Sequence, residues 1–112
     1  MTRLTSRFLI DLLIRRTDAA GGFATVIVPG DDQSGVILIQ CSDRGVAGPL
    51  LERRFSMAGD YVWEDVGAAA GIDDQTRAAY YDRRKKADPD LWIVELDIAD
   101  APQLVAEWAA LA

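Results

Sequence analysis

Carboxylates are the side chains of this sequence whose number and spacing could support chemistry. The pair Asp88 and Asp90 lies between an expected helix end and an apolar strand, beside a basic run and the bulky Trp92. Carboxylate oxygens bind Mg²⁺ and Ca²⁺, and carboxyl groups can act as general acids and bases. The alternative, which we favour, is that both carboxylates hydrogen-bond to the backbone of a local turn. We therefore assign no catalytic, cofactor-binding or metal-ligating residue.

Histidine is absent from all 112 residues, and this absence excludes several classes of enzyme. Serine and cysteine nucleophiles that are activated by histidine need an imidazole as their base, so these mechanisms are excluded. The single cysteine, Cys41, can neither complete a zinc or iron-sulfur site nor form an internal disulfide. We expect Cys41 to be a half-buried, unreactive side chain in a reducing compartment.

The acidic net charge limits the kinds of partner that the protein can bind. Eighteen acidic and twelve basic side chains give a formal net charge of -6. Binding to nucleic acids depends largely on clustered Lys and Arg, so a nucleic acid is not an expected partner, although residues 83–86 form a basic run. No apolar stretch approaches the roughly twenty residues that span a bilayer. We expect a cytoplasmic protein without a membrane segment or a cofactor.

Several exposed or bulky side chains are candidates for contact with a partner. Arg15 and Arg16 could bind an anion or an acidic partner, although the solvated side of a helix also explains them. Tyr80 and Tyr81 are adjacent on an expected helix, where neighbouring positions diverge by about 100°, so one ring is expected to face outward. The full set of candidate interaction residues is Arg15, Arg16, Tyr80, Tyr81, Asp88, Asp90 and Trp92.

The hydropathy pattern predicts one α+β domain over residues 1–112. Residues 4–16 fit both a helical and a strand repeat. We choose a helix because of its length and because Gly21-Gly22 suits a left-handed cap, and we expect it to be buried on nearly every side. The remaining pattern predicts strands at 23–28, from about 34, and at 50–55, 61–66 and 91–94, with helices at 73–88 and from about 100.

The predicted order, α-β-β-β-β-α-β-α, indicates a mostly antiparallel sheet of about five strands with helices packed against one face. The loop after Val28 suits a hairpin, so we expect the first two strands to pair antiparallel. Residues 61–66 are mixed on both faces, which is typical of a partly exposed strand. Residues 91–94 are apolar on both faces, as in a strand inside a covered sheet.

One run of residues resembles a known family. The run Asp88-Pro89-Asp90-Leu91-Trp92 and the strand after it are similar to a small bacterial family known only as domain of unknown function 1491. Earlier parts of the chain also follow the order that this family shows: Arg15-Arg16, the stretch 19–24, Val26, Gly30-Asp31 and Gly35. The resemblance covers most of the chain. It implies no activity, ligand or catalytic residue.

The leading functional hypothesis is a small non-enzymatic domain that contacts another protein or a second copy of itself. It follows from the rich pattern of core residues and from the lack of any nucleophile-base arrangement. The alternative is a carboxylate-based enzyme, or a binder of a divalent cation or small molecule, centred on Asp88 and Asp90.

Overall fold

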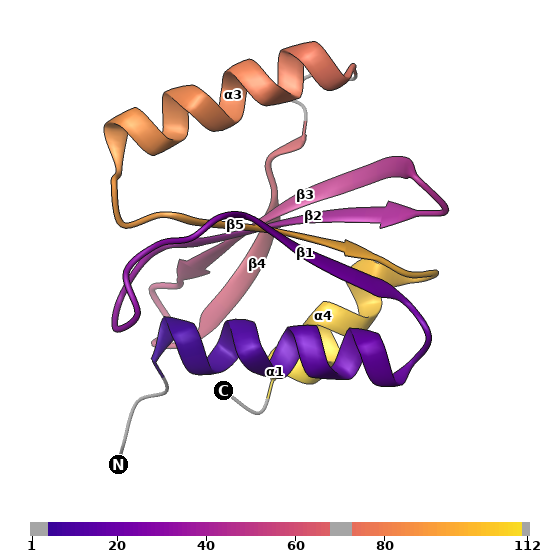
Figure 1. Ribbon diagram of the computed structural model, residues 1–112. Coiled ribbons are helices and arrows are strands. Elements are labelled where there is room, and N and C mark those ends of the chain that lie inside the picture. Colours follow the sequence, from indigo (N-terminus) through magenta and orange to yellow (C-terminus); the bar gives the residue numbers. More distant parts are fainter. Residues whose placement is uncertain (1–4, 68–72, 111–112) are drawn as a thin grey trace.

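The computed structural model describes residues 5–67 and 73–110. Helices pack on a mostly antiparallel sheet, which confirms the predicted α+β class and the predicted order of elements (Figure 1). The elements are α1 (Ser6–Ala19), β1 (Phe23–Val28), β2 (Ile37–Asp43), β3 (Val46–Phe55), β4 (Tyr61–Asp65), α3 (Asp74–Ala87), β5 (Trp92–Asp97) and α4 (Ala101–Ala109).

Within the described residues, five strands form one sheet in the order β1-β5-β2-β3-β4. β5 lies between β1 and β2, antiparallel to β1 and parallel to β2. The predicted pairing of the first two strands is therefore wrong. Burial explains the difference: Ile93, Val94 and Leu96 of β5 are fully buried. A strand that is apolar on both faces buries the most surface at the centre of a sheet that is covered on both sides.

The turn between β2 and β3 makes β3 longer than predicted. Arg44 and Gly45 both have positive φ, 53° and 79°, as a two-residue type I′ turn between antiparallel strands requires. β3 therefore begins at Val46 instead of residue 50, and β2 begins at Ile37 instead of near residue 34. β4 is an edge strand with most of its residues exposed, which confirms the predicted partial exposure.

The first element is a helix, as predicted. The hydroxyl of Thr5 caps its N-terminus by accepting a hydrogen bond from the backbone N–H of Phe8 at 3.1 Å. Gly21 follows its C-terminus with a φ of 88°, the left-handed conformation that glycine adopts without strain. Leu9 and Leu13 are fully buried, whereas Phe8 is 50% exposed. The expected burial on nearly every side is wrong, because only one side of α1 faces the sheet.

Helices cover both faces of the sheet, not the single face that we expected. α1 and α4 lie on one face and α3 lies on the other (Figure 1). Successive side chains of a strand point to opposite faces. Ile37 and Ile39 of β2 belong to the core cluster shared with α1 and α4, whereas Leu38 belongs to the cluster that contains Tyr80 of α3. Because both faces are apolar, both must be covered.

The ends of the last two helices follow local rules. The carboxylate of Asp73 caps α3 by accepting a hydrogen bond from the backbone N–H of Thr76 at 2.7 Å. α4 begins directly after Asp100, with Pro102 in its first turn, as predicted. Within the two described segments, no helix combines the length and apolar character needed to cross a membrane.

Candidate functional site

The turn from Asp88 to Asp90 packs against the loop between β1 and β2, together with Trp92, the first residue of β5. The carboxylate of Asp88 accepts a hydrogen bond from the backbone N–H of Asp90 at 3.1 Å. The backbone N–H of Asp31 donates to the carbonyl of Asp90 at 2.9 Å, and the indole N–H of Trp92 donates to the carbonyl of Asp31 at 2.7 Å. The Asp88 carboxylate thus bonds to the turn, as the structural interpretation predicts for both carboxylates, whereas Asp90 takes part in these contacts through its backbone. Trp92 is buried.

Two glycines allow this close approach. A Cβ atom at Gly30 would lie 2.3 Å from the carbonyl oxygen of Asp90, and a Cβ atom at Gly35 would lie 2.0 Å from the same oxygen. Any side chain at either position would therefore clash with the backbone. Gly30, Gly35 and the run from Asp88 to Trp92 all carried the family resemblance. The structure brings these separate stretches together as one packing contact.

Tyr80 and Tyr81 both face the sheet, which corrects the expectation that one ring points outward. Tyr80 is buried, and the hydroxyl of Tyr81 donates to the side-chain oxygen of Gln40 at 3.0 Å. Burial raises the pKa of Tyr81 above its ordinary value. The two positions lie on either side of the line along which α3 contacts the sheet, so both rings reach it. Neither ring forms an outward contact surface.

An ion pair between α3 and β3 was not predicted from the sequence. The guanidinium of Arg84 donates to the carboxylate of Glu52 at 2.6 Å and to the hydroxyl of Tyr80 at 2.9 Å. The side chain of Glu52 is only 11% exposed. Glu52 stands in the middle of β3 and also pairs with Arg54 of the same strand at 3.1 Å, but no local pattern indicates its second partner on α3. The ion pair between Arg84 and Glu52 connects α3 to the sheet.

The remaining predicted candidates do not converge on one site. Arg15 and Arg16 are exposed on α1, as expected for the solvated side of a helix. Asp90 is exposed and Asp88 is half-buried. Among residues 5–67 and 73–110, no three Cys, Asp or Glu side chains are grouped so that they could hold a metal ion.

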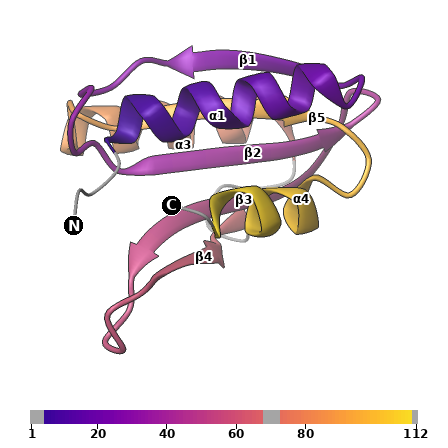
Figure 2. The ribbon, with the colours of Figure 1, turned by 90° about the horizontal axis from the view of Figure 1, so that it is seen from below.

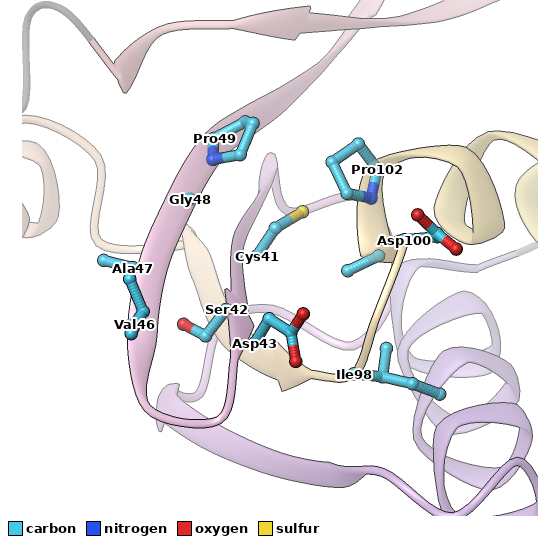
Figure 3. Close-up of a pocket in the computed structure, with 11 residues that line it drawn as sticks. Cys41, Ser42, Asp43, Val46, Ala47, Gly48, Pro49, Ile98, Asp100 and Pro102 are labelled. Carbon is cyan, nitrogen blue, oxygen red and sulfur yellow. The ribbon is translucent and has the colours of Figure 1, made fainter.

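A cavity of about 400 Å³ lies where the β2–β3 hairpin meets the start of α4 (Figure 3). Its walls come from the end of β2, the start of β3 and the segment from Ile98 to Pro102. Val46 is one of its apolar side chains, and Asp43 and Asp100 supply carboxylates. Such a cavity has the size of a small-molecule pocket and could accept an apolar group next to a cation.

Cys41 lines this cavity, and its sulfur points toward Pro102 (Figure 3). The side chain is 1% exposed, more completely buried than expected. Burial, reinforced by the negative charge of Asp65, raises the pKa of the thiol to about 12. Because the thiolate is the reactive form, the thiol is unreactive at neutral pH. The expected inert character of Cys41 agrees with this environment.

A group of large side chains is exposed along the β3–β4 hairpin. Phe55 is 58% exposed, Met57 is fully exposed, and Tyr61 is exposed as well. The rings of Phe55 and Tyr61 meet edge to face at 5.1 Å, and the guanidinium carbon of Arg53 lies 3.8 Å from the centre of the Tyr61 ring. We call these four residues the hairpin surface. Figure 2 shows the hairpin extending beyond α1 and α4.

A hollow of about 290 Å³ lies beside the hairpin surface. It is bordered by Ser6 at the start of α1, by residues 33–37 and by Arg53, Phe55 and Tyr61. The hollow therefore combines an aromatic wall, a cationic side chain and the polar backbone of a loop.

Comparison with known proteins identifies the family. A family model described as protein of unknown function (DUF1491) matches residues 4–106. The chain belongs to the DUF1491 family. No curated protein matches the sequence.

Solved structures of DUF1491 proteins share the fold. The crystal structure of a DUF1491 family protein from Caulobacter crescentus CB15 has 29% identity and a TM-score of 0.76, covering 88% of this chain and 91% of that chain. An NMR structure of a DUF1491 family protein from the same organism has 30% identity and a TM-score of 0.74, covering 89% and 90%. The solution structure of protein Atu0922 from A. tumefaciens has 31% identity and a TM-score of 0.73, covering 92% of both chains.

The hairpin surface of this DUF1491 protein was not predicted from the sequence. The available signal is that Phe55 and Tyr61 flank the turn at Gly59 and that Met57 lies within it, where polar residues are usual. Strand propensity alone does not show which apolar side chains a neighbouring helix will cover. That depends on where α1 and α4 lie.

Proposed function

We propose that this DUF1491 protein is a small, non-enzymatic domain that binds another protein through the hairpin surface. The observation that carries the proposal is the exposure of Phe55, Met57 and Tyr61 next to a hollow of about 290 Å³. Burying one such side chain stabilises a protein by roughly 1.5–3 kcal/mol, so their joint exposure leaves free energy available for binding. Exposed apolar groups beside a concavity are typical of partner contacts.

The residue types favour a partner segment that carries an apolar anchor next to a carboxylate. Tyr and Arg are enriched among the residues that dominate binding energy. Arg53 is the charged side chain among the described residues that line the hollow. A carboxylate of the partner would therefore be attracted, and a lysine in its place would be repelled. The apolar anchor would enter the hollow beside Phe55 and Tyr61.

The alternative site centred on Asp88 and Asp90 stays a hypothesis, and no feature of the described segments favours it. The Asp88 carboxylate is bonded to the turn, and the carbonyl of Asp90 accepts a hydrogen bond from Asp31. These contacts support a structural role for the turn.

We place this function in the cytoplasm, as part of the same proposal. The support is Cys41, a free and buried thiol that suits a reducing compartment.

Binding to short synthetic peptides tests the proposed surface. Each peptide carries a central Leu, Phe or Trp, flanked either by Asp or by Lys, and binding is measured by fluorescence anisotropy. We expect the Asp-flanked peptides to bind more tightly, and we expect the double variant Phe55→Ser and Tyr61→Ser to lose that binding by at least tenfold.

A matched control separates this surface from exposed apolar residues in general. Val46 is 71% exposed on the β2–β3 hairpin, away from β4, so Val46→Ser should leave peptide binding unchanged. Equal binding by the unchanged protein and the double variant would reject the proposed surface. A loss caused by Val46→Ser alone would move the site to the cavity around Cys41.

A further inference from the structure

β1 is an outer strand whose free edge carries no charge. It pairs with β5 on one side, and within the described segments no strand pairs with its other side. All six of its residues, Phe23 to Val28, are uncharged. Phe23 is 75% exposed, and Val26 and Ile27 are each 40% exposed. The edge therefore presents apolar side chains beside backbone groups that can form hydrogen bonds.

The two edges of the sheet differ in how they are protected. Monomeric proteins commonly protect an edge strand with charged residues, prolines or bulges, because an open edge can pair with another chain. β4 ends in Glu64 and Asp65, and Glu64 forms an ion pair with Arg54 at 2.9 Å. β1 has neither a charge nor a proline, and its only protection in the described structure is the irregularity between Val26 and Val28.

We infer that β1 pairs antiparallel with β1 of a second copy of this chain. Charge favours the β1 edge over the β4 edge for this pairing. Two copies with a net charge of -6 repel each other, so a seam between them is favoured where neither copy contributes an acidic side chain. Pairing through β4 would instead gather Glu64 and Asp65 of both copies along one seam. Pairing through β1 brings no charged strand residue together.

The sequence of β1 also suits pairing with itself. An antiparallel register centred on Thr25 places Thr25 opposite Thr25 of the second copy and Ala24 opposite Val26, all before the irregularity between Val26 and Val28. Threonine pairs are favourable across antiparallel strands. The result is a continuous sheet that has the acidic β4 at both outer edges. This inference is independent of the proposed function, since the hairpin surface lies at the opposite edge of the sheet.

Sedimentation equilibrium of the whole chain tests the self-association. We expect the unchanged protein to form dimers as its concentration rises, and we expect Thr25→Lys, which places two like charges opposite each other, to weaken dimerisation at least tenfold. Val62→Lys introduces the same charge on the exposed part of β4 and should leave dimerisation intact. Far-UV circular dichroism checks that both variants are folded.

Cysteine crosslinking tests the register. Directly opposed residues in antiparallel strands have Cα atoms about 4.5–5.5 Å apart, within the range of a disulfide. Thr25→Cys should therefore oxidise readily to a covalent dimer. In this register, Phe23 of one copy lies about four residues, or roughly 13 Å, from Phe23 of the other, so Phe23→Cys should crosslink poorly. The buried Cys41 does not compete.

Three results would overturn the inference. They are a monomer at the highest concentration reached, a loss of dimer caused by Val62→Lys but not by Thr25→Lys, and equal crosslinking of the two cysteine variants.

Discussion

A methyl group at Gly35 should destabilise the protein by forcing apart two segments that the fold brings together. A Cβ atom there would lie 2.0 Å from the carbonyl oxygen of Asp90 and 3.0 Å from Cδ1 of Trp92. Carbon and oxygen atoms normally stay about 3.3 Å or more apart. The variant Gly35→Ala must therefore move the loop away from the start of β5 by roughly 1 Å.

The cost can be estimated from the contacts that this movement would disturb. Overpacking a filled site costs about 1–3 kcal/mol. The movement also strains two hydrogen bonds of 2.7 Å, from the hydroxyl of Ser6 to the carbonyl of Gly35 and from the indole N–H of Trp92 to the carbonyl of Asp31. Each contributes about 0.5–1.5 kcal/mol. We expect the free energy of unfolding to fall by roughly 4 kcal/mol, a large part of the 5–15 kcal/mol typical of a domain.

Urea unfolding, followed by tryptophan fluorescence and circular dichroism, measures this change. Gly48→Ala is the matched control. A Cβ atom at Gly48 would lie 3.5 Å from the carbonyl oxygen of Cys41, which is ordinary contact, so we expect a change of about 0.5 kcal/mol or less. If Gly35→Ala destabilised the protein no more than Gly48→Ala does, the close approach at Asp90 would not be a rigid requirement of the fold.

Three further predictions concern side chains with unusual surroundings. The thiol of Cys41, whose pKa burial raises to about 12, should react with a disulfide reagent only after unfolding. The contribution of this thiol to the free energy of unfolding should be complete below pH 9 and lost between pH 9 and 12, because the thiol of the unfolded chain ionises first. Urea titrations of the unchanged protein and of Cys41→Ala measure this contribution. A difference in the free energy of unfolding between the two proteins that stays constant with pH would contradict the prediction. Arg84→Met removes an ion pair to a largely buried carboxylate and should lower the free energy of unfolding by about 1–3 kcal/mol in thermal melts, whereas Arg83→Met, on the exposed side of α3, should change it little. Asp73→Ala should destabilise α3 at pH 7 but not at low pH. The backbone hydrogen bond from Thr76 lowers the pKa of the Asp73 carboxyl, so the cap is lost as pH falls through that value. An equal loss of stability at pH 7 and pH 2 would refute this.

Local sequence signals are sufficient for features that depend on a few neighbouring residues. Asp73 caps α3, Gly21 ends α1 in the left-handed conformation, and α4 starts after Asp100. Each depends on the backbone conformation or hydrogen bonding of one turn. The α+β class also follows from the order of such elements.

The order of strands could not be predicted in the same way. The loop after β1 suits a hairpin, but the buried strand β5 takes the place beside β1, and this choice depends on residues about seventy positions away. The position of α3 on the second face depends on contacts such as Tyr81 with Gln40, which no local pattern shows.

The candidate sites illustrate the same limit. The turn at Asp88 was correctly interpreted as a local hydrogen-bonding structure, because the carboxylate bonds only two residues away. The exposure of Phe55 was not predicted, because the apolar character of a strand residue does not tell whether a helix covers it. Exposure is a property of the assembled layers.

Chemical-shift mapping of the ¹⁵N-labelled protein with the tightest-binding Asp-flanked peptide tests the proposed interaction surface most directly. If the hairpin surface binds the partner, the backbone amides of Arg53, Phe55 and Tyr61 and those bordering the hollow will shift in proportion to bound peptide. Shifts centred on Asp88 and Asp90, or on the cavity around Cys41, would contradict that assignment.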